Sequence, residues 1–307
     1  MAVDLRERLR KTNDVLLHYP PLHSMLADWG KDLESNLSQW ILDHPEKYQD
    51  ALRQGFAAGC DFAGTQTQAA SPWRAEPFGL RHKIYEFNYQ TAKLAREVTP
   101  PDRYVLGHVS LTNPDFLQPL GNMSYEEVYE GFKEQMAALV EGGIDVFLLV
   151  GNQTDAGEIA TKVAKDICDL PIIFQNVFFA TKKGFRTMLG LTPEEASARA
   201  KKAGADVVGG SCGLMTKSLE TSEWYPSATN LVRAMGQGCS PPLSIQPDAG
   251  IAQLVDGKTV YPVSPDEMAG EVVRWVEAGA RIVGGCCGTN MEHYRKMDQA
   301  LKAKGLR

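Results

Sequence analysis

A repeated pattern of helix end, glycine and short apolar run constrains the fold of this chain more than any other feature of its sequence. In each copy, Gly follows the last helical turn, where a residue in the left-handed conformation ends a helix. The apolar, β-branched run that comes next is typical of a strand that is buried on both faces, as in a parallel sheet. Copies of the pattern occupy residues 57–62, 141–150, 202–208 and 277–283.

Further apolar runs fill the intervals between these copies. Segments 104–109, 171–177 and 242–245 predict three more strands, and segment 60–67 brings the number to seven. An eighth strand at 14–18 is short and stands directly before two prolines. Beyond the start of the second strand, a new strand begins roughly every 37 residues, which is the length of one strand-plus-helix unit.

The segments between the strands carry helix-start signals. Ser124 is followed three positions later by Glu127, which is the spacing of a capping box. Thr192 and Ser264 each stand before a Pro and two acidic residues, so that they predict N-caps with Pro in the first turn.

Alternating strands and helices of this number predict a (β/α)8 TIM barrel whose first strand is degenerate. The competing fold is an open, doubly wound sheet, but no Gly-x-Gly-x-x-Gly follows the first strand. We expect one barrel domain over residues 1–307, in which residues 1–43 form an N-terminal extension or an irregular first unit.

The composition excludes several classes of partner. The 307 residues include 32 Lys and Arg against 38 Asp and Glu, a net charge of −6, which argues against a nucleic-acid binder. No apolar run reaches the length of about 18 residues that a membrane helix needs. Residues 1–13 are charged and lack the apolar core of a secretory signal, so we expect a cytoplasmic protein. In that compartment the six cysteines indicate metal ligands, a reactive thiol or core packing rather than disulfides.

Three of the cysteines stand at predicted strand ends, where barrel enzymes place their chemistry. Cys212 ends the sixth strand, and Cys286 and Cys287 end the eighth. These strands are two apart around a closed ring, so their ends can converge. Three thiolates on one cation make an open Zn²⁺ site with a fourth position for an exchangeable group.

Core packing is the alternative explanation for a buried cysteine. We expect it for Cys60, Cys168 and Cys239. A disulfide between Cys286 and Cys287 would strain the peptide that joins them. The chain has no Cys-x-x-Cys pair, so the spacing alone leaves metal binding open.

The segment Gly284–Thr289, with Cys212 earlier in the chain, resembles the signature of the zinc-dependent homocysteine S-methyltransferase family. That family includes betaine–homocysteine methyltransferase and the homocysteine domain of cobalamin-dependent methionine synthase. The resemblance runs from about residue 44 to the end and is strongest after residue 120; other matching segments are 119–128, 187–193 and 246–250. It implies a barrel, a Zn²⁺ cofactor held by Cys212, Cys286 and Cys287, and methyl transfer from a small, betaine-like donor to homocysteine.

Two departures from the family pattern keep other functions open. The family carries Asp-Gly-Gly or a similar turn after its first strand, where this chain has His18-Tyr19-Pro20-Pro21. The family also has Glu at the end of the fourth strand, whereas segment 149–153 has no acidic residue. A second hypothesis is therefore an enzyme that demethylates an O-, N- or S-methyl compound and methylates a separate corrinoid protein. A third is a zinc-holding sensor or carrier without turnover.

Polar residues at predicted strand ends are candidates for binding the substrate. We select Gln66, Asn152, Asn176 and Asp248, for which hydrogen bonds that cap loops are the alternative role. His108 in the third strand is expected to be a core residue. A cationic donor would favour an aromatic cage, and its candidates are Trp40, Trp73, Phe78, Tyr85, Trp224 and Tyr225. Partners are thus a methyl donor and either homocysteine or a corrinoid protein, and a homo-oligomer is left open.

Overall fold

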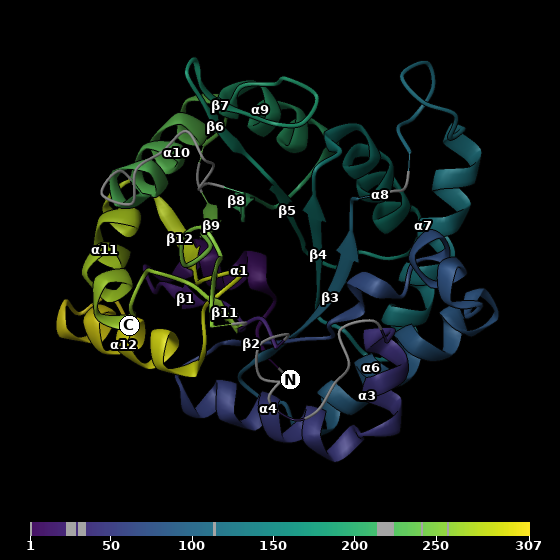
Figure 1. Cartoon of the computed structure of the whole chain (residues 1–307), viewed down its shortest axis with the longest axis horizontal. Coiled ribbons are helices and arrows are strands. Elements are labelled where there is room, and N and C mark those ends of the chain that lie inside the picture. The colour runs from purple at the N-terminus through teal and green to yellow at the C-terminus, as the bar shows by residue number, and fades with distance from the viewer. Residues whose placement is uncertain are drawn as a thin grey trace.

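Eight parallel strands form a ring at the centre of the molecule, and helices surround it (Figure 1). The computed structural model describes residues 2–22, 29, 35–112, 115–213, 224–240, 242–256 and 258–307. The order of neighbouring strands is β1-β12-β9-β8-β5-β4-β3-β2. Their bounds are β1 (Leu16–Leu17), β2 (Phe62–Gly64), β3 (Tyr104–Ser110), β4 (Val146–Gly151), β5 (Ile172–Asn176), β8 (Val207–Ser211), β9 (Leu243–Gln246) and β12 (Ala280–Val283).

The ring closes between its two terminal strands through one residue. The backbone N–H of Asp61, just before β2, donates to the Leu17 carbonyl of β1 at 2.8 Å. The Asp61 carboxylate accepts the Leu17 N–H at 2.8 Å in return. The predicted barrel is therefore confirmed as a nearly closed one, and its first strand is as short as the sequence indicated.

Two hairpins extend beyond the barrel strands and were not predicted. They connect β5 with the next helix and β9 with the next helix, and they consist of β6 (Phe179–Thr181) with β7 (Gly184–Arg186) and β10 (Gln253–Val255) with β11 (Lys258–Val260).

The helical layer lies outside the strands, as repeated strand–helix units require. Its longer helices are α3 (Leu37–Asp43), α4 (Pro45–Ala57), α6 (Ile84–Val98), α7 (Tyr125–Glu141), α8 (Thr154–Ile167), α9 (Pro193–Ala203), α10 (Trp224–Gly238), α11 (Pro265–Glu277) and α12 (Met291–Ala303). A short helix, α5 (Pro72–Ala75), and the 3-10 turns η1 (Thr67–Ala69), η2 (Glu76–Phe78) and η3 (Arg81–Lys83) separate β2 from α6. Within the described ranges, each helix is too short or too polar to span a membrane.

The predicted helix starts are confirmed by their caps. Thr192 and Ser264 both form capping boxes, in which the side chain three residues on bonds back to the cap. The Ser124 side chain accepts the Glu127 N–H and caps α7. These caps satisfy backbone N–H groups that have no partner inside the helix, and they fix where each helix leaves the barrel.

One end of the barrel is closed by a helix that the sequence pattern did not predict. Helix α1 (Leu5–Lys11) places Leu5 and Leu9 in the apolar cluster that fills the barrel interior. That cluster includes Phe62, Tyr104 and Val207, the first residues of their strands. Helix α1 therefore covers the amino ends of the strands and leaves the carboxyl ends for chemistry.

Candidate metal centre

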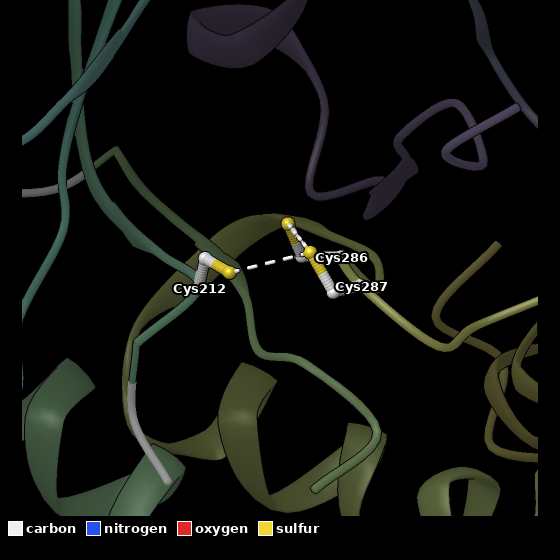
Figure 2. Close-up of side chains that lie close together, drawn as sticks. All are labelled: Cys212, Cys286 and Cys287. Atoms are coloured by element: carbon white, nitrogen blue, oxygen red, sulfur yellow. Dashed lines mark hydrogen bonds between the residues drawn. The ribbon is translucent and has the colours of Figure 1, made fainter. Parts of the chain in front are cut away.

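The three predicted cysteines meet at the carboxyl ends of two strands. Cys212 directly follows β8, and Cys286 and Cys287 follow β12; β9 lies between these strands in the sheet. The Sγ atom of Cys287 is 3.6 Å from that of Cys212 and 4.0 Å from that of Cys286, and all three sulfurs lie within 4.8 Å of one another. Figure 2 shows the sulfurs directed toward one another from separate segments of backbone.

The end of β9 holds the two cysteine segments in place. The Cys212 N–H donates to the Gln246 carbonyl at 3.0 Å, and the Cys286 N–H donates to the Pro247 carbonyl at 2.8 Å. The Ala249 N–H donates in turn to the Cys287 carbonyl at 2.8 Å. Cys212 has a φ of 51°, which is uncommon for a residue with a Cβ and is retained where neighbouring contacts hold it. Backbone hydrogen bonds thus hold the two cysteine segments in place.

Glycine is required beside the cysteines because the chain is crowded there. Gly288 has a φ of 80°, and a Cβ on it would lie 2.1 Å from the Tyr261 ring. A Cβ on Gly284 would lie 2.7 Å from the Cβ of His18. These contacts explain why glycine, and no larger residue, occupies positions 284 and 288 beside the cysteine pair.

The spacing of the sulfurs fits a tetrahedral zinc ion. Zn–S bonds of about 2.3 Å at tetrahedral angles place neighbouring sulfurs about 3.8 Å apart. The measured separations of 3.6 and 4.0 Å lie on either side of that value. Three soft sulfur ligands are also the donor set that favours zinc over magnesium or calcium. The residues therefore fit the ion that the sequence predicted.

The pKa values of the three thiols are shifted in different directions. Hydrogen bonds from Cys212 and then from Cys286 lower the pKa of the Cys287 thiol, because both stabilise its thiolate. The same proximity to Cys212 and Cys287, together with burial, raises the pKa of Cys286 well above its ordinary value. For Cys212, the contact with Cys286 lowers the pKa, but its bond to Cys287 and its burial outweigh this and raise the value to about 11. A cation is needed before all three can ionise.

Asp248 and Gln66, two of the four predicted substrate residues, lie at strand ends and are buried. Asp248 stands between Pro247 and Ala249, which follow β9 and bond to the segment of Cys286 and Cys287, and its charge acts on Cys287. Its Oδ1 accepts the Gly250 N–H at 3.2 Å. Gln66 follows β2 with a φ of 56°, and its buried Nε2 has no hydrogen-bond partner among the described residues.

The other two predicted residues, Asn152 and Asn176, lie at the ends of neighbouring strands. Asn152 directly follows β4 and is half-buried. Asn176 ends β5, and its Oδ1 accepts a hydrogen bond at 2.7 Å from the hydroxyl of Thr154, the first residue of α8. This bond draws Asn176 toward the helical layer.

Several side chains at the mouth were not selected from the sequence. Tyr261 packs on Gly288, and its pKa is raised by burial and then by the charges of all three cysteines. The Tyr19 hydroxyl lies 2.8 Å from Nδ1 of His108, and His18 is fully buried beside them. His108, which was expected in the core, is half-buried. Tyr261 follows the unpredicted hairpin β10–β11, so no periodic pattern could place it.

The described aromatic candidates for a cage lie in the helical layer. Trp40 stacks on His44 at a centroid distance of 4.5 Å, and Trp73 contacts Phe132 edge-on at 5.3 Å. Phe78 and Tyr85 are both exposed, and Tyr85 stacks on Tyr89. The side chains of Trp224 and Tyr225 lie outside the part of the chain that the structure describes.

The other three cysteines pack as expected. Cys60 is buried within the main core cluster, and Cys168 and Cys239 are half-buried against it. Burial is also the leading reason that the pKa of each of these thiols is raised.

Comparison with known proteins assigns the chain to a family. A sequence model described as homocysteine S-methyltransferase matches residues 10–301, which is nearly the whole chain. The chain belongs to the homocysteine S-methyltransferase family. The resemblance inferred from the cysteine motif is thereby confirmed. Methionine synthase of Mycobacterium leprae (strain TN) is 28% identical over 269 residues, which is 84% of this chain and 21% of that protein. The chain therefore spans about a fifth of the length of this relative.

Solved structures support the same fold. The metallated form of the homocysteine methyltransferase MmuM from Escherichia coli superposes with a TM-score of 0.74 at 19% identity, covering 98% of this chain and 99% of that one. A carboxyl transferase domain of Rhizobium etli pyruvate carboxylase reaches 0.52 at 14% identity, covering 98% of this chain and 49% of that one. At these identities the likeness shows the barrel alone, and the cysteine cluster carries the chemistry.

Proposed function

We propose that this homocysteine S-methyltransferase family member moves a methyl group from a small methylated donor to the thiol of homocysteine, giving methionine. Cys212, Cys286 and Cys287 would hold the zinc ion that the reaction uses. The observation that carries the proposal is the convergence of these three sulfurs within 4.8 Å at the open end of the barrel. Family membership supplies the substrate class.

A thiol at its ordinary pKa of about 8.5 is mostly protonated near neutral pH and attacks carbon slowly. Held by the three cysteine thiolates, a zinc ion would leave a fourth position for an exchangeable group and would favour the deprotonated form of a thiol there. In the transfer itself, a lone pair on the substrate sulfur forms the new bond to the methyl carbon while the bond from that carbon to the donor atom breaks.

The chain's own residues contribute position and enclosure. The bonds from β9 hold Cys212 and Cys286 in fixed positions, so the sulfur cluster needs little reorganisation. Helix α1 fills the opposite end of the barrel, so both substrates enter at the carboxyl ends of the strands. Asp248, which acts electrostatically on Cys287, is the predicted substrate residue that we place nearest to the reacting groups.

Methylation of a separate corrinoid protein is a second candidate function. It is favoured by the absence of acidic residues at two strand ends, where His18 follows β1 and Asn152 follows β4. A site without those carboxylates loses obvious partners for the ammonium group of an amino acid. A cytoplasmic location is part of the proposal, and a homo-oligomer stays open.

The decisive experiment is a methyl-transfer assay on zinc-loaded protein. Homocysteine is supplied with betaine, S-methylmethionine or methylcobalamin, and methionine is measured. Formation of methionine with any donor supports the proposal. Zinc binding without methionine formation, together with methylation of a corrinoid protein by a methoxy or methylamine compound, would establish the second candidate instead. Stoichiometric zinc with neither reaction would leave a sensor or carrier.

A further inference from the structure

Three buried polar side chains that lie in barrel strands or shortly after them have hydrogen-bonding atoms without partners among the residues that the structure describes. They are His18, Gln66 and Gln175, with exposed fractions of 0%, 2% and 0%. The atoms concerned are Nε2 of His18, Nε2 of Gln66 and Oε1 of Gln175. Most buried polar atoms in native proteins are hydrogen-bonded, so a group of unpartnered ones at a candidate active site requires an explanation.

His18 provides a hydrogen-bond donor inside the barrel. It lies against Gly284, two residues before Cys286, and its ring centroid is 5.5 Å from that of Phe62 in the interior cluster. Its Nδ1 accepts the Tyr19 backbone N–H at 3.1 Å. Burial lowers the pKa of His18 to about 3, so the ring is neutral and its one proton is on Nε2. Within the described part of the chain, that N–H has no acceptor.

Gln175 provides an acceptor on the other side of the cysteine strands. It lies in β5, which pairs with β8, the strand that leads to Cys212. Its Nε2 donates to the Ser244 hydroxyl at 3.0 Å. The bond passes over Gly209, where an added Cβ would lie 2.0 Å from Ser244 Oγ and 3.1 Å from Gln175 Cγ. The amide nitrogen is thus fixed by Ser244, and Oε1 is left without a donor.

Gln66 provides a second donor at the end of β2, which adjoins β1 where the barrel closes. Its φ of 56° lies in the left-handed region, which a glutamine seldom adopts. The next residue fixes this conformation, since Thr67 Oγ1 donates to the His108 carbonyl at 2.7 Å. Strained backbone that neighbouring contacts maintain is typical of functional positions.

We propose that His18, Gln66 and Gln175 form an uncharged subsite for the amino-acid end of the thiol substrate. His18 and Gln66 donate hydrogen bonds to its carboxylate, and Gln175 accepts one from its ammonium group. The assignment rests on the proposed function. It provides one ligand for both kinds of unpartnered atom, the two N–H donors and the oxygen acceptor. It also explains how a zwitterion is held where the family's acidic residues are missing, because hydrogen bonds from neutral groups to charged ones are strong.

The subsite is tested by comparing three thiols on zinc-loaded protein. Homocysteine carries both charged groups, 4-mercaptobutyrate lacks the ammonium, and 3-mercaptopropylamine lacks the carboxylate. We expect the wild type to prefer homocysteine in kcat/KM by about tenfold or more over each analogue. Gln175→Met should abolish only the preference over 4-mercaptobutyrate. His18→Asn, which keeps an acceptor for the Tyr19 N–H, should reduce only the preference over 3-mercaptopropylamine, since Gln66 still binds the carboxylate.

Matched variants separate binding from a structural role. His18→Gln places an amide N–H near the original Nε2 and should restore part of the lost preference. Thr91→Val removes a different unpartnered buried atom, from helix α6, and should leave all preferences unchanged. If His18→Asn and Gln175→Met instead slow all three thiols equally, the side chains are structural and the subsite is refuted.

A binding measurement removes the dependence on turnover. Calorimetry with methionine, which has the same amino-acid end, should show a Kd about tenfold weaker in His18→Asn and Gln175→Met than in the wild type. An unchanged Kd in both variants overturns the subsite. If the wild type binds methionine and the variants do not, the subsite is supported even where no thiol is methylated. A failure to methylate any thiol would then count against the proposed function alone.

Discussion

The Sγ atoms of Cys212 and Cys287 lie 3.6 Å apart, although 75 positions separate the two residues in the chain. Two strand ends on either side of β9 produce this contact, and Cys286 completes the cluster at 4.0 Å from Cys287. Sulfurs at these distances form three corners of a tetrahedron whose fourth corner is available to a substrate. The first two predictions concern this cluster.

Replacing one cysteine should remove both metal and activity. In Cys286→Ala, two sulfurs remain, and we expect zinc content measured by mass spectrometry to fall from one per chain to nearly none. Methyl transfer should fall to background in the same preparation. Cys239→Ala, which changes a half-buried thiol outside the cluster, should keep both. One zinc per chain in Cys286→Ala would remove that residue from the site.

Zinc affinity should fall steeply as the pH is lowered. Zinc needs deprotonated ligands, and the pKa values of Cys212 and Cys286 are raised while that of Cys287 is lowered. Near neutral pH, zinc must therefore displace about two protons, and its Kd should weaken by about a hundredfold per pH unit. Competition with a chelator between pH 6.5 and 8 measures this slope. A slope near zero would show that the thiols are already ionised.

His18 should make folding stability depend on pH in the acid range. Its pKa is lowered by burial to about 3 in the folded protein, against 6.5 in the unfolded chain. The unfolded chain thus binds the extra proton, and stability present above pH 6.5 is lost as the pH falls from 6.5 toward 3. One such group contributes about 1.4 kcal/mol per pH unit. Urea unfolding at pH 6 and pH 5 gives the change in the free energy of unfolding per pH unit. This change should be smaller by about that amount in His18→Asn than in the wild type, and an equal change in both proteins would contradict the prediction.

Two glycine substitutions should act in opposite directions. Gly209→Ala places a Cβ 2.0 Å from Ser244 Oγ inside the barrel, and we expect a loss of about 1–3 kcal/mol in the free energy of unfolding. Gly270→Ala, in helix α11 with no atom within 4 Å, should gain about 0.5–1 kcal/mol because alanine favours a helix. Chemical denaturation measures both. Equal effects would show that the space around Gly209 can adjust.

Much of the fold could be read from local patterns. The glycine-ended helices and apolar runs predict β4, β8 and β12 because burial on both faces leaves an unambiguous apolar stretch. The caps at Thr192 and Ser264 depend only on residues three positions apart. Helix α1 was missed although Asp4 caps it by accepting the Arg6 and Glu7 N–H groups. Its place on the barrel depends on Leu5 and Leu9, which contact strands distant in sequence.

The candidate site divides in the same way. The cysteine motif identified the three sulfurs, since their residue type and glycine neighbours are visible in the chain. Tyr261, Gln175 and His18 were missed, because glutamine, tyrosine and histidine occur in many roles and no spacing marks these three. Asn176 was selected for its place at a strand end, and only the bond from Thr154 shows that it leans toward a helix.

By itself, the sequence determined the strand–helix alternation, the helix starts and the identity of the sulfur ligands, because each depends on residues that are neighbours in the chain. Tertiary structure alone decided that Cys212 comes within 3.6 Å of Cys287, that His18 takes up the space beside Gly284, and that Gln175 reaches Ser244 over Gly209. The physical reason is ring closure: the register of parallel strands sets which side chains share a layer, and that register depends on the packing of the whole barrel.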